Sequence, residues 1–203
     1  MLQIKSKYKI AKRLGAGVFE KTQTQKFALS EARRRKQRSR RPRTLSDYGK
    51  QLIEKQKVRY TYGLSEKQFS KYVHEAMEKA EPAVALHRAL ETRLDNVAYR
   101  MGLAPTRRAA RQLVSHGHLL VNGRRMTIPS HRVRIGDAIL VREGSKEKGM
   151  LPNAEETAEA TQVPQWLSFD AKAKSGSITG EAVYEPVGES VLDYAAVLEF
   201  YSR

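Results

Sequence analysis

The segment "RLDNVAYRMGLAPTRRAARQLVSHGHLLVNGRR", residues 93–125, mixes apolar residues with nine arginines and histidines. After Asp95 it contains neither a lysine nor an acidic residue. Burying a charge without a partner is costly, so a folded chain tolerates positive charge at this density only outside its core. The fold therefore has to separate an apolar face from an arginine-rich face throughout this segment.

Helical spacing predicts two short helices that achieve this separation. Gly102 ends the first helix, Thr106 caps the second, and Gly117 stops it. The apolar residues of the first share an arc of about 100°: Leu94, Val97, Ala98 and Met101. The apolar side of the second consists of Ala109, Ala110, Leu113 and Val114. Its opposite side carries Arg107, Arg108, Arg111, Gln112 and Ser115.

Strands are predicted to follow these helices. In "HLLVNGRRMTI", the Asn122-Gly123 pair between two apolar runs is a strong signal for a β-hairpin. "RVRIGDAILV", residues 132–141, predicts another pair of strands around Gly136-Asp137. With every basic residue expected off the core face, two helices and a hairpin favour a nucleic-acid-binding surface. A basic helix alone would more often be plain solvated surface.

The charge of the whole chain points to a polyanionic partner. The 203 residues carry a formal net charge of +16, which opposes compactness and suits a polyanion-binding protein. Residues 1–43 contain 15 lysines and arginines against 2 acids, whereas residues 143–203 carry an acidic excess. The absence of cysteine excludes disulfides and cysteine-ligated metals. Without an apolar run of about 18 residues or a secretory signal, we expect a cytoplasmic protein that does not span a membrane.

The most basic stretch is "RRRKQRSRRPR", residues 33–43, with eight basic residues in eleven. Such a run repels itself, and we expect it to be disordered until phosphates neutralise it. It contains no aromatic residue, so we expect it to clamp the nucleic-acid backbone rather than stack on bases. A solvated or localisation-like tail is the alternative. The predicted RNA contacts are Arg33, Arg34, Arg35, Lys36, Arg38, Arg40, Arg41 and Arg43.

Residues 44–90 predict a helical domain. Ser46 caps a helix that ends at Gly63, Ser65 and Gln68 form a capping box for the next, and Pro82 suits the first turn of a third. The core stripe of the second helix is predicted as Phe69, Val73, Ala76 and Ala80. Four basic residues of the first helix are candidates for RNA contact, with a solvated face as the alternative: Lys50, Lys55, Lys57 and Arg59.

No catalytic or metal site is expected. His116 and His118 flank Gly117 without a nearby carboxylate, so His116 is better explained as a phosphate contact or a helix-end residue. "RLGAGVFEK" lacks the lysine–hydroxyl pair of a phosphate-binding loop. We therefore expect no enzyme, no cofactor and no small-molecule substrate.

Three stretches resemble a known family. "RLDNVAYRMGLAPTRRAARQLVSHGHLLVNGR" resembles the S-four RNA-binding domain, which several families of RNA-handling proteins contain. "LSDYGKQLIEKQKVRYTYGLSEKQF", residues 45–69, resembles the helical domain of the bacterial small-subunit ribosomal protein S-four family, and "WLSFD…VLDYAAVLEFYSR" resembles its C-terminus. The resemblance covers about residues 42–203. The cysteine knuckle that often binds a metal in this family is missing here.

The resemblance implies an α+β fold in which the RNA-binding domain, a helix–helix–strand motif on a small twisted antiparallel sheet, is inserted into the helical domain. The expected domains are a basic N-terminal extension (1–43), a helical domain (44–90 with 187–203) and the RNA-binding domain (91–186). The last helix, near residues 190–203, is expected to pack on residues 44–90 through Val191, Leu192, Ala195, Leu198 and Phe200.

The implied function is that of a structural protein of the small ribosomal subunit, which binds 16S ribosomal RNA early in assembly. It would lie beside proteins S-three and S-five, near the path of the messenger RNA. The predicted RNA contacts of the inserted domain are Arg93, Arg100, Thr106, Arg107, Arg108, Arg111, Gln112, Ser115, His116, Asn122, Gly123 and Arg124. A stand-alone RNA-binding regulator or ribosome-rescue factor is the alternative, although such a module would not need residues 45–69. An RNA-modifying enzyme is a third.

Overall fold

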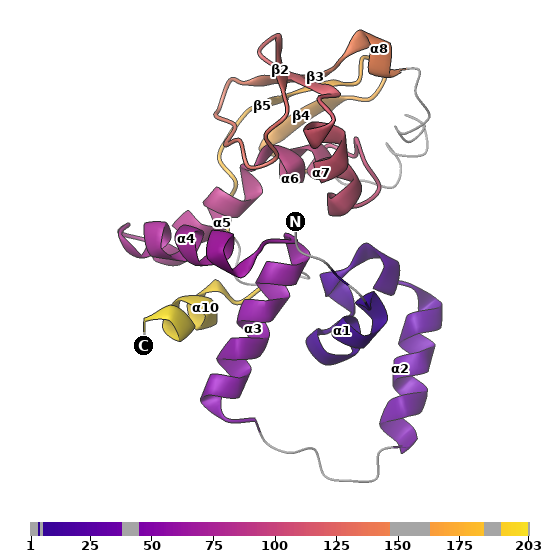
Figure 1. The fold of residues 1–203 in the computed structure, drawn as a ribbon, viewed down its shortest axis with the longest axis vertical. Helices are drawn as coiled ribbons and strands as arrows, with labels where there is room; N and C mark the ends of the chain where they lie inside the picture. The colour runs from indigo at the N-terminus through magenta and orange to yellow at the C-terminus, as the bar shows by residue number, and fades with distance from the viewer. Residues whose placement is uncertain (1–3, 5, 38–44, 147–162, 185–191, 203) are drawn as a thin grey trace. The chain divides into compact units, whose positions relative to one another are not determined.

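A computed structural model describes residues 4, 6–37, 45–146, 163–184 and 192–202 (Figure 1). The chain forms two compact units. One unit comprises Met1–Leu86 together with Glu185–Arg203, and the other comprises His87–Tyr184. Helices and a small antiparallel sheet confirm the expected α+β class.

The first unit contains the predicted helices α3 (Asp47–Thr61) and α4 (Glu66–Met77), and α5 (Pro82–Glu91) begins in it. The hydroxyl of Ser46 accepts a hydrogen bond from the backbone N–H of Gly49, and that of Ser65 accepts one from Gln68. Gly63 has φ +62°, the left-handed conformation that ends a helix. The two serine caps and the stop at Gly63 are confirmed.

The core stripe of α4 is confirmed except at its end. Phe69, Val73 and Ala76 are buried, whereas Ala80 is exposed, so its assignment to the core was wrong. The reason is that α4 ends at Met77, and Ala80 no longer follows the helical spacing.

The last helix, α10 (Tyr194–Tyr201), packs against α3 and α4. Its buried residues are Tyr194 and Val197. Of the predicted set, Phe200 packs on Tyr48 of α3 with ring centroids 5.4 Å apart, Leu192 and Leu198 are half-buried, and only Ala195 is exposed. The hydroxyls of Tyr62 and Tyr194 lie 3.1 Å apart inside this contact. Val191 lies outside the described residues. The helix begins at Tyr194, later than the expected start near residue 190. The reason is that the carboxylate of Asp193 caps it by accepting a hydrogen bond from the backbone N–H of Ala196.

The N-terminal part is ordered by an apolar cluster of its own. It comprises α1 (Lys7–Leu14), the 3₁₀ turns η1 (Ala16–Val18) and η2 (Glu20–Thr22), and α2 (Gln25–Gln37). The cluster consists of Ala11, Leu14, Val18, Phe19 and Phe27, with Ile53 and Tyr60 of α3 packed against it. Packing therefore orders this cysteine-free segment.

Helix α2 changes the expectation for the basic run. Residues 33–37 continue the helix instead of being disordered. Arginine, lysine and glutamine are good helix formers, so a helix anchored by Phe27 can extend into the run. Residues 38–43 lie outside the described residues.

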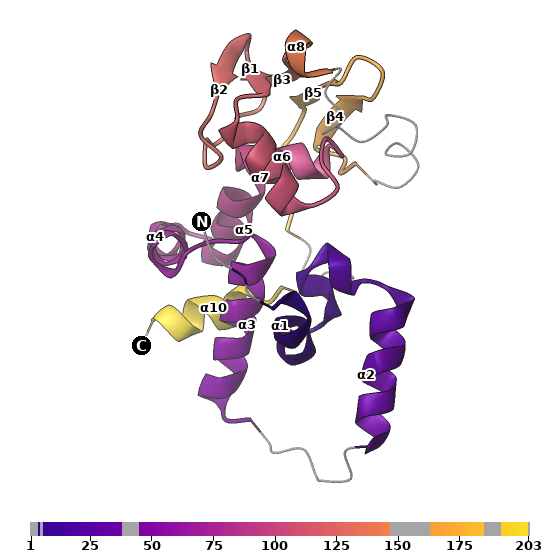
Figure 2. The ribbon, with the colours of Figure 1, turned by 45° about the vertical axis from the view of Figure 1, so that its right-hand side comes forward.

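The second unit contains a five-stranded antiparallel sheet in the order β2-β1-β3-β5-β4 (Figure 2). The strands are β1 (Leu119–Val121), β2 (Arg124–Met126), β3 (Ala138–Val141), β4 (Leu167–Asp170) and β5 (Ser175–Ile178). Asn122 and Gly123 have φ of +49° and +77°, as a type I′ turn requires. The predicted hairpin is confirmed.

One face of this sheet packs on α6 (Leu94–Arg100) and α7 (Arg107–Ser115), and α8 (Glu143–Lys146) follows β3. The four predicted apolar residues of α6 are buried, together with Ala110, Leu113 and Val114 of α7. At Gly176 a Cβ would lie 2.6 Å from the carbonyl oxygen of Ser168 and 2.9 Å from Cε of Met101. Glycine thus permits the close approach of β5 and α6.

Only one strand of the second predicted pair is confirmed, namely β3 at Ala138–Val141. Of residues 132–137, only Arg132 forms a bridge, with Arg93, and β3 pairs with β1 and β5 instead. Ile135, an apolar residue of the strand that is not formed, is 58% exposed. The cause is local, because the carboxylate of Asp137 accepts the backbone N–H of Arg134 at 2.7 Å and forms a turn there.

Candidate RNA interface

Helix α7 separates its charged and apolar sides as predicted. The hydroxyl of Thr106 accepts the backbone N–H of Ala109 at 3.2 Å and starts the helix. Arg108, Gln112 and Ser115 are exposed, while Arg107 and Arg111 are half-buried at the edge of the same side. The helix therefore presents guanidinium groups on the side that faces away from the sheet.

Asp95 fixes the orientation of Arg111. Its carboxylate is buried and accepts hydrogen bonds from Nε of Arg111 at 2.7 Å and from the guanidinium of Arg93 at 2.8 and 3.0 Å. A buried carboxylate with charged partners is stabilised only while those partners stay in place. Arg111 is consequently part of the structure and not a freely moving surface charge.

Glu91 organises a second group of side chains. This buried carboxylate accepts hydrogen bonds from Arg100 at 2.9 and 3.0 Å and from the amide of Asn96 at 3.0 Å. The side-chain oxygen of Asn96 in turn accepts a hydrogen bond from Nε of Arg107 at 2.9 Å. The Arg107 guanidinium lies 4.4 Å from the ring centroid of Tyr99. Two buried carboxylates thus orient three arginines before any ligand binds, which reduces the entropy lost on binding.

Arg93 requires a correction. We expected it to face outward, but it is 1% exposed and is paired with Asp95. Its backbone also bridges Arg132. A buried, ion-paired arginine cannot contact a phosphate, so Arg93 does not belong to the interface.

The basic residues of α3 divide in a similar way. Lys55 is buried, with Nζ 2.7 Å from Glu66 and 4.5 Å from the ring centroid of Phe200, so its placement on the surface was also wrong. Arg59 pairs with Glu66 at 3.1 Å. Lys57 pairs with Glu54, and Lys50 is exposed beside Asp47.

The charge on Glu66 is held by this cluster. Burial opposes that charge, but hydrogen bonds from Lys55 and Tyr201 and the positive charges of Lys55 and Arg59 outweigh it and lower the pKa of Glu66. The Tyr201 hydroxyl donates to Glu66 at 2.6 Å, and both burial and this carboxylate raise the pKa of Tyr201. The cluster connects α10 with α3 and α4.

The hairpin tip is exposed at Asn122, Gly123 and Arg124. The Asn122 amide also has a structural role, because it donates to Asp137 at 2.8 Å and accepts the backbone N–H of Ala138 at 2.9 Å. His116 is exposed at the end of α7, and its ring centroid lies 5.9 Å from that of His118.

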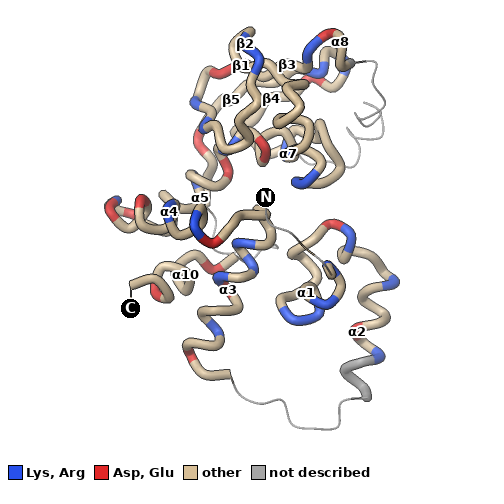
Figure 3. Tube along the Cα trace, in the orientation of Figure 1, with Lys and Arg blue, Asp and Glu red and all other residues tan. Residues whose placement is uncertain are grey.

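The N-terminal basic run is only partly described. Arg33 is exposed on α2, and Arg34, Arg35 and Lys36 belong to the same helix. The remaining predicted contacts lie outside the described residues: Arg38, Arg40, Arg41 and Arg43. Figure 3 shows further basic residues along α1.

Sequence reasoning missed the residues that support the arginines, namely Glu91, Asp95 and Asn96. The signal that could have revealed them was Asp95, the one acidic residue of the arginine-rich segment 93–125, which stands next to the apolar positions of α6. It also missed Arg125, whose guanidinium donates to the carbonyl oxygens of His116 and Gly117 at 3.1 and 3.3 Å. Gly117 has φ +71°, the left-handed conformation that favours glycine, and a Cβ there would displace the Arg125 guanidinium.

Other site types find no support in the described part of the chain. Within it, no three His, Cys, Asp or Glu residues gather as metal ligands. None of the helices there combines the length and apolar character needed to cross a bilayer.

A helix pair packed on an antiparallel sheet, with preoriented arginines on the second helix, defines an RNA-binding protein. Comparison with known families agrees. Residues 92–139 match the S4 domain, and residues 3–94 match the ribosomal protein S4/S9 N-terminal domain. The second match includes the N-terminal extension, which the resemblance described above did not cover.

Curated relatives identify the family. The chain is 41% identical over 198 residues to small ribosomal subunit protein uS4 of Roseiflexus castenholzii, covering 96% of both chains. It is 46% identical over 162 residues to that of Streptococcus thermophilus, covering 78% of each chain, and 44% identical over 160 residues to that of Acetivibrio thermocellus, covering 78% of this chain and 76% of the relative. The chain belongs to the uS4 family of small-ribosomal-subunit proteins, which are structural proteins and not enzymes.

Proposed function

We propose that this protein is a primary 16S ribosomal RNA-binding component of the small ribosomal subunit, and that it nucleates assembly of the subunit's 5′ domain. The observation that carries the proposal is the set of arginines on α6 and α7. Arg100, Arg107 and Arg111 are oriented by buried partners, and Arg108 is exposed beside them. Fixed guanidinium groups suit the bidentate recognition of phosphates in a folded RNA junction.

The contacts are proposed to come from two surfaces. The first is the side of α7 formed by Arg107, Arg108, Arg111, Gln112 and Ser115, with Arg100, Thr106, His116 and the hairpin tip at residues 122–124. The second is the basic run of residues 33–43, which would clamp the RNA backbone. Because phosphate contacts release counterions, both surfaces should make binding depend on salt.

We also propose that the chain folds as three parts: residues 1–43, residues 44–90 with 187–203, and residues 91–186. The contact between α10 and α3 supports the pairing of the two distant segments. The N-terminal part holds the apolar cluster of Ala11, Leu14, Val18, Phe19 and Phe27, which packs on Ile53 and Tyr60 of α3 within the same compact unit.

In the assembled subunit, we place the protein in the cytoplasm beside ribosomal proteins S-three and S-five, near the channel through which messenger RNA enters. From there it would contribute to translational accuracy. Its partners would be ribosomal RNA, those proteins and messenger RNA, without a membrane or a small-molecule substrate.

The test is binding to a transcript of the 16S 5′ domain, followed by addition of proteins that assemble later. The protein should bind this transcript more tightly than a size-matched RNA and should be required for the later proteins to join. Equal affinity for both RNAs, or assembly that proceeds without the protein, would contradict the proposal. A stand-alone regulator would also fail to co-purify with intact small subunits.

A further inference from the structure

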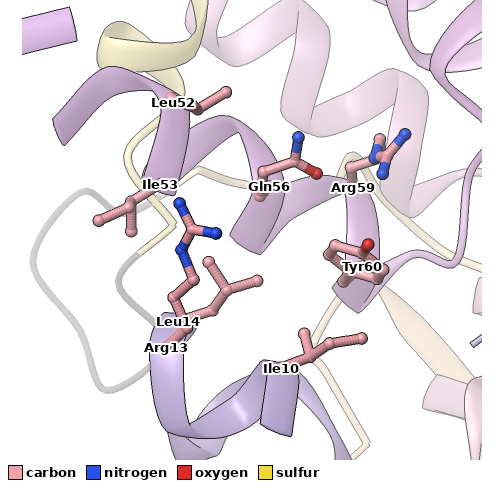
Figure 4. A pocket seen from close by; sticks show the side chains of 8 residues that line it. All are labelled: Ile10, Arg13, Leu14, Leu52, Ile53, Gln56, Arg59 and Tyr60. Atoms are coloured by element: carbon pink, nitrogen blue, oxygen red, sulfur yellow. The ribbon is translucent and has the colours of Figure 1, made fainter. Parts of the chain in front are cut away.

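The first unit contains a pocket between α1 and α3 (Figure 4). Its cavity volume is about 230 Å³, below the ~300–1,000 Å³ of typical small-ligand pockets, so it suits only a small group. In Figure 4, Arg13 and Leu14 point from α1 toward α3. The lining is mainly apolar, with Arg13, Gln56 and Arg59 as its polar residues. The apolar part consists of Ile10, Leu14, Leu52, Ile53 and the ring of Tyr60.

Two buried polar atoms belong to residues of this lining. Oε1 of Gln56 and Nε of Arg59 have no hydrogen-bond partner among the described residues. Residues three apart on a helix share one side, so Gln56 and Arg59 occupy neighbouring positions on α3. The guanidinium of Arg59 is also held in place by Glu66 at 3.1 Å. Buried groups without a partner are costly, and a ligand that supplies the partners would remove this cost.

The chemistry of the pocket fits a nucleobase. A base is flat, its faces suit the apolar walls and the ring of Tyr60, and its edge carries donors and acceptors side by side. Proteins often recognise RNA through such unstacked bases. An apolar side chain of a partner protein would leave Oε1 of Gln56 and Nε of Arg59 without partners, so the pocket favours a base.

The surroundings supply positive charge for the phosphates on either side of such a base. Helix α1 contains four basic residues and no acid, and Lys9 and Arg13 are exposed. Figure 3 shows these basic positions along α1. A polyanion would therefore be attracted to this surface.

We propose that the α1–α3 pocket receives one unpaired base of the ribosomal RNA. Gln56 and Arg59 contact its edge, and the basic residues of α1 hold the flanking phosphates. The inference rests on the proposed function, since the ligand is part of the RNA bound by the rest of the protein.

The test uses Gln56→Met in the full chain, which keeps the length of the side chain and removes its hydrogen-bonding groups. The matched control is Gln51→Met on the same helix. Gln51 is buried, and its Oε1 also has no partner among the described residues, but it does not line the pocket. Because both changes remove an unsatisfied oxygen, neither should lower the melting temperature of the free protein.

Affinity for the 5′-domain transcript should fall about tenfold for Gln56→Met and stay unchanged for Gln51→Met. Chemical probing of base edges should show one base that wild type and Gln51→Met protect and Gln56→Met leaves reactive. Leu52→Trp, which fills the pocket, should expose the same base.

Each result has a defined meaning. If wild type does not bind the transcript, the proposed function fails and the pocket inference fails with it. If wild type binds while all variants match it in affinity and protection, only the pocket inference is overturned. If Leu52→Trp leaves the RNA footprint intact but loses a neighbouring protein from reconstituted particles, the pocket accepts a protein side chain, and the inference is again wrong.

Discussion

Arg111 donates a hydrogen bond to Asp95 at 2.7 Å, although the two residues are 16 positions apart and belong to different helices. The Asp95 side chain is 4% exposed and that of Arg111 is 15% exposed. One end of an arginine on the proposed RNA surface is thus anchored in the interior of the domain. Folding and RNA binding therefore both depend on this side chain. Substitutions on this surface should either lower stability together with RNA binding or lower RNA binding alone.

The first prediction concerns Arg111→Ala and Arg108→Ala. Arg111→Ala should lower the free energy of unfolding by about 1–3 kcal/mol, because it removes a partner of a buried carboxylate. Arg108 is exposed, so Arg108→Ala should change it by less than about 0.5 kcal/mol. Both should weaken RNA binding. Urea unfolding and filter binding provide the measurements, and equal stability of the two variants would contradict the structural role of Arg111.

Arg107, Arg108 and Arg111 therefore cannot all be treated as surface residues whose removal spares the fold. Arg107 also supports the structure, since it donates to Asn96 and lies over the ring of Tyr99. A combined change of all three residues would therefore mix loss of stability with loss of contacts. Arg108→Ala is the cleaner probe of the surface.

The second prediction concerns the basic run. Six substitutions to alanine are combined: Arg33, Arg34, Arg35, Arg38, Arg40 and Arg41. If four phosphate contacts are lost at ~0.7 each, the log–log dependence of affinity on salt should become shallower by roughly 3. The measurement is RNA affinity over a salt series, with circular dichroism as the control for helix content. An unchanged slope would show that the run is solvated and does not touch phosphate.

The third prediction concerns acid stability. The folded-state pKa of Glu66 lies below its ordinary value of 4.5, so its stabilising effect is present above that pH and is lost as the pH falls through the folded pKa. Glu66→Gln should therefore be less stable than wild type at neutral pH, and the difference should shrink below pH 4.5. Thermal unfolding over a pH series tests this. A difference that is constant with pH would exclude the charge of Glu66 as the cause.

The fourth prediction concerns α10. A fragment of residues 44–90 should be unstable alone, and a peptide of residues 187–203 should stabilise it. Tyr194 and Val197 are buried against the helical part, and burying each large side chain contributes about 1.5–3 kcal/mol. The measurement is thermal unfolding of the fragment with and without the peptide. Cooperative melting of the fragment alone, unaffected by the peptide, would contradict the proposed pairing of the two segments.

A variant of that peptide supplies the control. Val197→Ala should reduce the stabilisation because it removes buried methyl groups, whereas a change at the exposed Ala195 to serine should not. If both peptides act equally, the contact between α10 and α3 does not stabilise the fragment.

The sequence by itself determined the local features of this protein. Ser46, Ser65 and Thr106 each cap the predicted helix, and Asn122-Gly123 turns the predicted hairpin. The apolar arc of α6 is buried as its spacing required. These features depend on residues within a few positions of one another, so their physics can be read along the chain.

Only the tertiary structure decided which charges stay outside. Arg93 and Lys55 looked like surface residues, yet each is buried beside a carboxylate, and Glu66 is 11 positions away from Lys55. It also decided that β3 pairs with β1 and β5, and that α1 and α3 enclose a pocket. The physical reason is that burial and ion pairing depend on neighbours brought together by folding. A residue's own pattern along the chain does not specify those neighbours.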